Sequence, residues 1–306
     1  MTLSGAARTW VAHALGSPVA TASPLIGGVA SRMTAIRTED GREAVLRQLV
    51  SDPWRKHAVA LLTRERDVHG LLRDTPVPAP RTLALDPDGE TTGDPSLLMT
   101  RLGGALDLVT VDAARLASTL LTIHAVRPPA GRWPREYQSW ATEPKQVVPP
   151  WSTDDGLYRE AFTRLASDPP SYRRTFLHRD FHPGNVLWRR ARVTGVVDWV
   201  ETSSGPADLD VAHCASYLAG LHGVDAASAF RRSYVDQGGV LTSDADAATY
   251  WQVLDLVGLL PDGSGREGGA PAAVTSSIWA SHGRGDLTVD LVRRRREDLL
   301  RQVLRG

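Results

Sequence analysis

Two carboxylates and one carboxamide, Asp180, Asn185 and Asp198, stand at a spacing that suits chemistry on a phosphate group. Residues 186–188 and 193–197 are strand-like runs separated by a polar turn, which predicts a short hairpin. If the two strands pair antiparallel, Asn185 at the start of one lies near Asp198 at the end of the other. Both side chains can then bind one hard cation through oxygen, an arrangement that suits Mg²⁺.

Asp180 is left to face the hydroxyl group of a substrate. One carboxylate for the acceptor, with a carboxamide and a second carboxylate for the cation, are the working parts of a phosphoryl-transfer site. Protein kinases arrange them as His-Arg-Asp, four residues, Asn, and later a metal-binding Asp. The same order occurs here, since His178 and Arg179 precede Asp180 and four residues separate Asp180 from Asn185.

The complete sequence of this segment matches one family more closely than it matches protein kinases. Residues 178–188 read His-Arg-Asp-Phe-His-Pro-Gly-Asn-Val-Leu-Trp, and residues 195–199 read Gly-Val-Val-Asp-Trp. This closely resembles the aminoglycoside phosphotransferase and choline kinase-like family, whose loop reads His-Gly-Asp-Leu-His-Pro-x-Asn and whose metal-binding Asp lies in Ile-Asp-Trp or Ile-Asp-Phe. Arg179 stands where the family commonly has Gly. The alternative is a loop that carries acidic residues by chance.

The resemblance covers roughly residues 20–220 and implies an α+β, bilobal protein-kinase-like fold. A small antiparallel-sheet lobe, residues 1–101, would bind the nucleotide. A mostly helical lobe, residues 102–306, would carry catalysis and substrate binding. The length of 306 residues is sufficient for two such cores.

Composition narrows the class of protein. The formal net charge is zero, which argues against a nucleic-acid partner because such partners require a basic excess. Cys214 is the only cysteine, so neither a disulfide framework nor a cysteine metal cluster is expected. No apolar run of about 18 residues suggests a membrane span. We therefore expect a cytoplasmic protein with no membrane partner, and the sequence does not indicate its oligomeric state.

Residues 27–31, Gly-Gly-Val-Ala-Ser, lie between two strand-like runs. Backbone N–H groups of such a turn, with Gly28 and Ser31 as the named positions, can approach nucleotide phosphates. An ordinary hairpin turn explains the same residues. The family has a Gly/Ser-rich hairpin at this place in the chain, which favours the phosphate-binding interpretation.

Arg47 lies on a predicted strand over residues 43–49, and Glu65 lies on a predicted amphipathic helix over residues 55–73. The resemblance implies that Arg47 holds the α- and β-phosphates and that Glu65 orients it. Arg replaces the more common Lys, which keeps the charge but changes the geometry of the head group. The alternatives are an exposed strand arginine and a solvated helix glutamate.

Residues 99–104, Met-Thr-Arg-Leu-Gly-Gly, resemble the hinge of the family. There, backbone groups of Thr100, Arg101 and Leu102 would contact the nucleotide base, and the two glycines would bend the chain. A strand end followed by a glycine turn is the alternative.

The pattern of apolar residues predicts mainly helices in the second half of the chain, including residues 209–221, 226–237, 244–260 and 287–304.

Glu201 and Asp208 are candidate contacts to the substrate, and Glu201 would suit a cationic one. Asp210 matches a family residue that braces the catalytic loop. We expect His124 and His182 to be structural. The Trp- and Pro-rich residues 127–152 can stack on a ring-shaped substrate or anchor a lid, and Asp255, Asp262 and Glu267 can add acidity to a substrate cleft.

These features predict a kinase that moves the γ-phosphoryl group of ATP, or GTP, to a hydroxyl of a small molecule, with Mg²⁺ as cofactor. The acceptor would be an aminoglycoside or other antibiotic, or a metabolic amino alcohol or sugar. A protein kinase is disfavoured because Trp199 and Val200, not Phe-Gly, follow Asp198. The second alternative is a nucleotide-binding module without catalysis, which the replacement of Lys by Arg47 leaves open.

Overall fold

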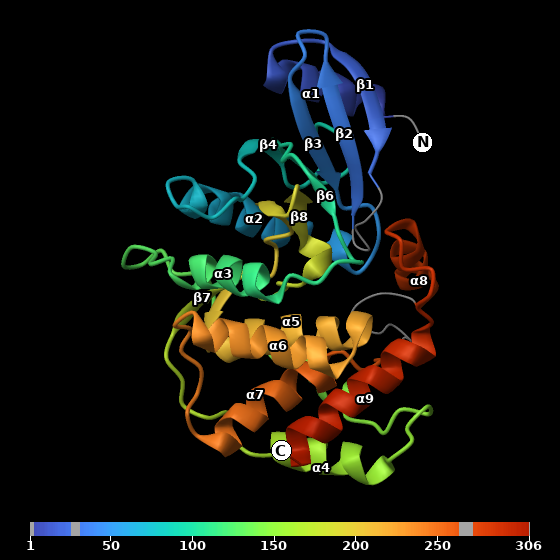
Figure 1. Cartoon of the computed structure of the whole chain (residues 1–306). Coiled ribbons are helices and arrows are strands. Elements are labelled where there is room, and N and C mark those ends of the chain that lie inside the picture. The colour runs from blue at the N-terminus through green and yellow to red at the C-terminus, as the bar shows by residue number, and fades with distance from the viewer. Residues whose placement is uncertain (1–2, 26–30, 263–271, 306) are drawn as a thin grey trace. The chain divides into compact units, whose positions relative to one another are not determined.

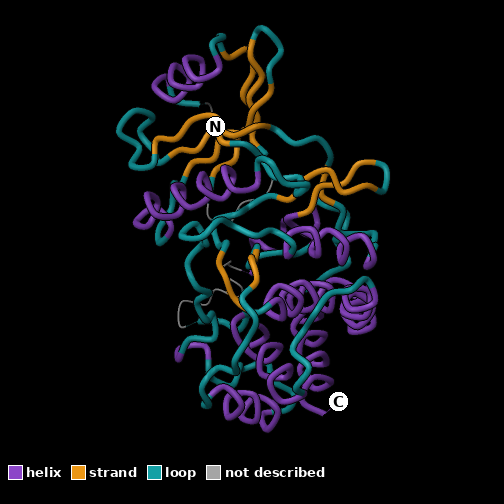
Figure 2. The backbone as a smooth tube through the Cα atoms, turned by 90° about the vertical axis from the view of Figure 1, so that its left-hand side faces the viewer, coloured by secondary structure: helices purple, strands orange, loops and turns teal. Residues whose placement is uncertain are grey.

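The computed structural model describes residues 3–25, 31–262 and 272–305. It divides into two compact units, one formed by Met1–Ala105 with Leu187–Glu201 and the other by Leu106–Val186 with Thr202–Gly306. The boundary expected from the sequence, after residue 101, lies close to the first of these divisions. The grouping of residues 187–201 with the first unit was not expected. Strands dominate the first unit and helices the second (Figure 2).

The first unit contains a five-stranded antiparallel sheet in the order β1-β2-β3-β5-β4. Figure 1 labels β1, β2, β3 and β4 of this sheet. The strands are β1 (Val19–Pro24), β2 (Arg32–Thr38), β3 (Glu43–Gln48), β4 (Thr82–Asp86) and β5 (Ser96–Thr100). Helix α1 (Gly5–Leu15) begins at the N-cap Ser4, whose side chain accepts from the N–H of Ala7, and ends at Gly16 with φ of 67°.

The alternation of side chains along β3 explains the position of Arg47. Ala44 and Leu46 pack with the apolar residues of α1, whereas Val45 packs with Leu62 of α2 (Ala58–Leu72). Since successive strand residues point to opposite faces, Arg47 shares the face of Val45 and points toward α2. A 3₁₀ turn, η1 (Trp54–His57), occupies the beginning of the predicted helix.

Residues 187–201 join the first unit through hydrogen bonds to two of its segments. Strands β8 (Val186–Arg189) and β9 (Arg192–Val196) are neighbours in a small sheet of order β6-β8-β9, with β6 at Ala105–Leu106. The N–H of Val196 donates to the carbonyl oxygen of Pro78 at 2.8 Å. Arg64 of α2 donates to the carbonyl oxygen of Val200 at 2.6 Å. The predicted hairpin is therefore present and is bound to the sheet unit.

The second unit is built around α5 (Ala207–His222), which packs against α6 (Val224–Asp236), α7 (Ala245–Gly258) and α9 (Val289–Arg305). Nearly every residue of α5 is buried. The remaining helices and turns are α3 (Ala113–His124), α4 (Asp155–Leu165), α8 (Ala272–Ser281), η2 (Glu143–Lys145) and η3 (Pro183–Asn185). Strands β7 (Thr175–Leu177) and β10 (Ser203–Gly205) pair antiparallel. Among the described residues, no helix has the length and apolarity needed to cross a bilayer.

Candidate active site

The loop that carries Asp180 follows β7 and is fixed by a buried carboxylate. Asp210 of α5 accepts the backbone N–H groups of His178 at 2.9 Å and of Arg179 at 2.7 Å. Nε2 of His124 donates to the same carboxylate at 3.0 Å, and the hydroxyl of Tyr234 contacts the other ring nitrogen of His124 at 2.7 Å. The predicted bracing contact of Asp210 is present, and His124 supports it from α3.

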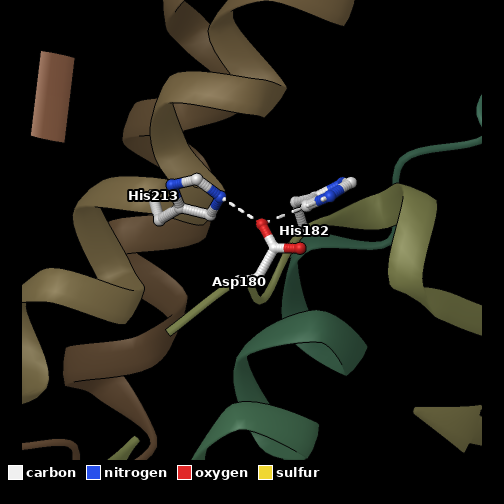
Figure 3. A group of neighbouring side chains, drawn as sticks. All are labelled: Asp180, His182 and His213. Atoms are coloured by element: carbon white, nitrogen blue, oxygen red, sulfur yellow. Dashed lines mark hydrogen bonds and ion pairs between the residues drawn. The ribbon is translucent and has the colours of Figure 1, made fainter. Parts of the chain in front are cut away.

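Both oxygens of the Asp180 carboxylate have hydrogen-bond partners. Figure 3 shows His213 and His182 beside one of these oxygens. Nδ2 of Asn185 contacts Oδ2 at 2.9 Å and the backbone oxygen of Asp180 at 2.8 Å. Nε2 of His213, from α5, contacts Oδ1 at 3.0 Å. The Asp180 side chain is 25% exposed. Its orientation is thus fixed while part of it stays accessible.

His182 shapes the loop. Its Nδ1 accepts the N–H of Gly184 at 3.0 Å, and its ring stacks on Tyr217 with centroids 3.9 Å apart. Asp180, His182 and His213 offer ligand atoms within 4.8 Å of one another, as a metal site would. Because Nδ1 of His182 is an acceptor, the neutral ring carries its proton on Nε2 and has no lone pair for a metal there. We therefore interpret the three residues as a hydrogen-bond network.

The electrostatics of this network keep Asp180 charged. Burial opposes ionisation, but the hydrogen bond from His213 and the nearby His182 hold the pKa of Asp180 well below its usual range. His213 also contacts Asp255 of α7, with Nδ1 2.9 Å from Oδ1. Burial disfavours a charged ring, but Asp255 and Asp180 outweigh it and raise the pKa of His213 to about 9.

Arg179 has a left-handed backbone, with φ of 71°, at the position where the related motif has Gly. Its guanidinium lies 3.8 Å from the centroid of the Trp140 ring, and Nη1 is 3.7 Å from Oδ1 of Asp255. The cation therefore belongs to a buried cluster behind Asp180. Trp140, from the Trp-rich segment, covers this cluster.

The first unit contains a second charged cluster around Arg47. Nη1 of this residue lies 3.1 Å from both carboxylate oxygens of Glu65 and 2.9 Å from Oδ1 of Asp198. Burial opposes the charge of the guanidinium, but Asp198 and Glu65 raise its pKa above the usual value. Burial raises the pKa of Glu65, and Arg47 counteracts that effect. Arg47 is thus a buried, permanently charged group, unlike the exposed strand arginine considered as an alternative.

Asp198 follows β9 and has a left-handed backbone, with φ of 66°. Such strain in a non-glycine residue is typical of functional positions. The next side chain, Trp199, is buried and donates from Nε1 to the carbonyl oxygen of Val196 at 2.9 Å. This contact anchors the turn that presents Asp198.

The donor groups fit a hard cation. The Asp198 side chain is 29% exposed, and the contact of Arg47 is to Oδ1, which leaves Oδ2 for a ligand. In Asn185, Nδ2 faces two oxygens of Asp180, so the amide Oδ1 points elsewhere. A carboxylate oxygen and a carboxamide oxygen are ligands that Mg²⁺ accepts. That both bind one ion remains a prediction.

The remaining nucleotide-binding candidates occupy different environments. Ser31 is buried, with Oγ 3.5 Å from the sulfur of Met33, and Gly28 lies outside the described residues. The N–H of Thr100 donates to the carbonyl oxygen of Arg81 at 2.9 Å, so it is engaged within the sheet.

The next two residues of the predicted hinge face different ways. Nη1 of Arg101 lies 3.2 Å from Glu43. Leu102 packs so closely on Gly195 that a Cβ atom there would lie 2.7 Å from its Cδ1. A role of Thr100, Arg101 or Leu102 in binding the base stays a prediction.

The two substrate candidates also differ. Glu201 is half-buried at the end of the first unit's second segment. Asp208 is buried at the start of α5, and its carboxylate accepts the N–H of Thr242 at 3.2 Å and the hydroxyl at 3.1 Å. Thr242 therefore accounts for the position of Asp208 without a substrate.

Sequence reasoning did not identify His213, and it named Asp255 only as a general source of acidity. One signal was available, because Asp210 and His213 stand three positions apart on one helix face. A helix whose Asp210 braces the loop also directs His213 to that loop. The partner of His213 on α7 has no comparable signal, since it depends on how two helices pack.

Solved structures of known phosphotransferases resemble this chain in fold. The chain is similar in structure to macrolide 2′-phosphotransferase MphH from Brachybacterium faecium, with 17% identity, TM-score 0.57, and 95% of this chain and 96% of that chain covered. It is also similar to aminoglycoside phosphotransferase APH(4)-Ia, with 18% identity, TM-score 0.60, and 97% and 98% covered. Macrolide 2′-phosphotransferase type I gives 17% identity, TM-score 0.60, and 98% and 99% covered.

A search of curated proteins found no significant match. The model of the phosphotransferase enzyme family matches residues 21–250, which is most of the chain and includes Arg47, Asp180 and Asp198. The chain therefore belongs to the phosphotransferase enzyme family.

Proposed function

We propose that this protein transfers the γ-phosphoryl group of ATP to a hydroxyl group of a small molecule. The observation that carries the proposal is the carboxylate of Asp180, whose two oxygens are both held by hydrogen bonds. Family membership supports a phosphotransferase. The related APH(4)-Ia has been crystallised with ADP and hygromycin B and with AMP-PNP and hygromycin B, which supports a nucleotide as donor.

The residues have distinct roles in this proposal. Asp180 accepts a hydrogen bond from the acceptor hydroxyl and aligns its oxygen with the phosphorus atom. Arg47, oriented by Glu65, neutralises phosphate oxygens of the nucleotide. Asn185 and Asp198 would hold Mg²⁺, which supplies charge neutralisation on the β- and γ-phosphates when bound.

The low pKa of Asp180 is consistent with this role. A carboxylate with a depressed pKa is a weak base, so it orients the hydroxyl more than it removes the proton early. Phosphoryl transfer through a loose transition state needs little proton transfer until late in the reaction. Asp180 can then take up the proton once the new O–P bond has formed.

The charges beside Asp180 bear on the acceptor. The imidazolium of His213 faces its carboxylate, and the Arg296 guanidinium of α9 lies 5.2 Å from the ring centroid of Tyr217, which stacks on the neutral ring of His182. Asp255 in the same region is engaged by His213. Within the described part of the chain these groups favour an acceptor with little positive charge over a polycation. Glu201 is the candidate that would favour a cationic acceptor instead.

The proposal is tested by ADP release in the presence of Mg²⁺ and ATP, or GTP, with a panel of acceptors. The panel includes macrolides, aminoglycosides, sugars, choline and homoserine. We expect turnover with a weakly charged acceptor and a loss of about 1,000-fold in kcat for Asp180→Asn. Asp236→Asn, at an exposed position of α6, is the matched control and keeps full activity.

Two results would contradict the proposal. Full turnover in Asp180→Asn would remove the role of its carboxylate. Binding of Mg-ATP without turnover on any acceptor would favour the nucleotide-binding module. The direct contact between Arg47 and Asp198 is the observation that keeps this second candidate in view, because the guanidinium occupies an oxygen of a predicted metal ligand.

A further inference from the structure

His213 connects the carboxylate of Asp180 to a second, fully buried carboxylate. Its Nε2 lies 3.0 Å from Oδ1 of Asp180, and its Nδ1 lies 2.9 Å from Oδ1 of Asp255. His213 and Asp255 are both buried, and the three side chains come from the catalytic loop, α5 and α7. Figure 3 shows the imidazole edge directed at the Asp180 carboxylate.

The geometry requires a proton on each ring nitrogen. A carboxylate oxygen only accepts, so each short contact needs an N–H on the imidazole. A neutral ring would place a nitrogen lone pair against a carboxylate oxygen on one side. The charged ring avoids this repulsion, and burial makes the two charge-assisted hydrogen bonds strong. Asp255 is further neutralised by Arg179, whose Nη1 is 3.7 Å away.

We propose that His213, held by Asp255, is a positioning residue that fixes the Asp180 carboxylate for the acceptor hydroxyl. This inference rests on the proposed phosphotransfer function. Asn185 holds Oδ2 and the imidazolium holds Oδ1, so the carboxylate plane cannot rotate about its Cβ–Cγ bond without breaking a hydrogen bond. The exposed part of Asp180 then always presents the same edge to the acceptor.

Because His213 must be charged for this role, the positioning of Asp180 should depend on pH. The titratable groups that face the ring are Asp180, Asp255, His182 and Tyr217, the last with its ring centroid 4.9 Å away. Because the pKa of His213 is raised to about 9, the imidazolium persists below that pH and is lost above it. We therefore expect kcat to fall on the alkaline side near pH 9.

Three substitutions separate this role from a purely structural one. His213→Leu removes both hydrogen bonds and should lower kcat about 10- to 100-fold, as the loss of a residue that orients a functional side chain typically does. His213→Gln keeps a neutral donor and should recover part of that loss. Asp255→Asn keeps an acceptor for Nδ1 but removes its charge, so the alkaline fall should move to lower pH. His222→Gln, on the same helix, is the control and should match the unchanged protein.

The decisive measurement combines kinetics with NMR of the full chain. We expect KM for ATP to stay within about twofold in His213→Gln while kcat falls, and His213→Gln to have no further effect in an Asp180→Asn background. Nitrogen-15 NMR of the histidine ring should show both nitrogens protonated at pH 7 and a lower titration midpoint in Asp255→Asn.

The outcomes are separable from those of the proposed function. If no acceptor is phosphorylated, the function fails, and the NMR result still decides whether His213 is a doubly hydrogen-bonded imidazolium. A neutral His213 ring at pH 7 would overturn the inference. An unchanged kcat in both folded His213 variants would also overturn it, as would additive effects of His213→Gln and Asp180→Asn.

Discussion

At the scale of single residues, the first unit depends on Arg47. Its guanidinium is buried between Glu65 and Asp198 and is the shared partner of two carboxylates. A lysine would offer a compact ammonium in place of a planar fork, so the two contacts would be made differently. The same charge that neutralises Glu65 is the one proposed to meet the nucleotide phosphates.

Arg47→Met should therefore affect stability and binding separately. Loss of the cation leaves Glu65 buried without compensation, which should lower the free energy of unfolding by about 3 kcal/mol. Adding Glu65→Gln should recover most of this stability but not the affinity for Mg-ATP. Chemical unfolding and calorimetry measure the two effects, with the exposed Arg37→Met as control. Recovered affinity in the double variant would contradict the assignment of Arg47.

The sequence singled out Asp180, Asn185 and Asp198 as candidates because their chemistry is tied to fixed spacing within one segment, and Asn185 does contact Asp180. It did not predict the His213–Asp255 pair, because those residues lie on different helices and meet only through packing. The contact of Arg47 with Asp198 was unforeseen for the same reason, since 151 positions separate them.

At the scale of elements, α2 is fixed to the sheet by a buried neutral histidine. Nδ1 of His69 contacts the hydroxyl of Thr82 on β4 at 2.9 Å. Burial, aided by the charge of Arg47, lowers the pKa of His69 from 6.5 to about 4. Protonation is therefore easier in the unfolded chain, so the stabilisation is complete above pH 6.5 and is lost as pH falls from 6.5 toward 4.

This predicts a specific acid sensitivity. The shift corresponds to a loss of about 3 kcal/mol in the free energy of unfolding over that range. Urea unfolding at pH 7, 5.5 and 4 should show this fall in the free energy of unfolding in the unchanged protein and in the exposed control His57→Gln. It should be missing in His69→Gln. The same acid loss in His69→Gln would show that other groups cause it.

The two glycines of the predicted hinge, Gly103 and Gly104, differ in how closely they are packed. Gly104 has φ of 113°, and a Cβ there would lie 2.5 Å from Oγ1 of Thr194 and 2.8 Å from the carbonyl oxygen of Trp188. A Cβ atom added at Gly103 would have no such neighbour within 4 Å. Gly104→Ala should thus cost about 2 kcal/mol or more, and Gly103→Ala less than about 1 kcal/mol. Equal thermal stability of the two variants would contradict the close packing at Gly104.

Strands and amphipathic helices were predictable because their apolar periodicity is local, as for α2 and the strands that end at Gln48 and Thr100. The helix α8 was not predicted, because its hydrophobic residues follow no clear period and it comes after a glycine-rich segment. The assignment of residues 187–201 to the first unit depends on the hydrogen bond between Val196 and Pro78 and could not be predicted from a local pattern.

At the scale of the whole molecule, the chemistry is divided between two units. The Arg47 cluster and Asp198 belong to the first, and the Asp180 network belongs to the second. In the proposed function, the first set would meet the nucleotide and the second set the acceptor hydroxyl, and the predicted cation ligands Asp198 and Asn185 come from one unit each. The proposed phosphoryl transfer would need both sets of residues.

The measurement that tests this account most directly is the mass balance of the reaction. ADP and phosphorylated acceptor are quantified together, by chromatography and mass spectrometry, for the unchanged protein and for Asp180→Asn. We expect one phosphorylated acceptor for each ADP, and a loss of about 1,000-fold in both products when Asp180 is replaced, with Mg-ATP affinity retained. ADP formed without a phosphorylated acceptor, or equal product from Asp180→Asn, would contradict the account.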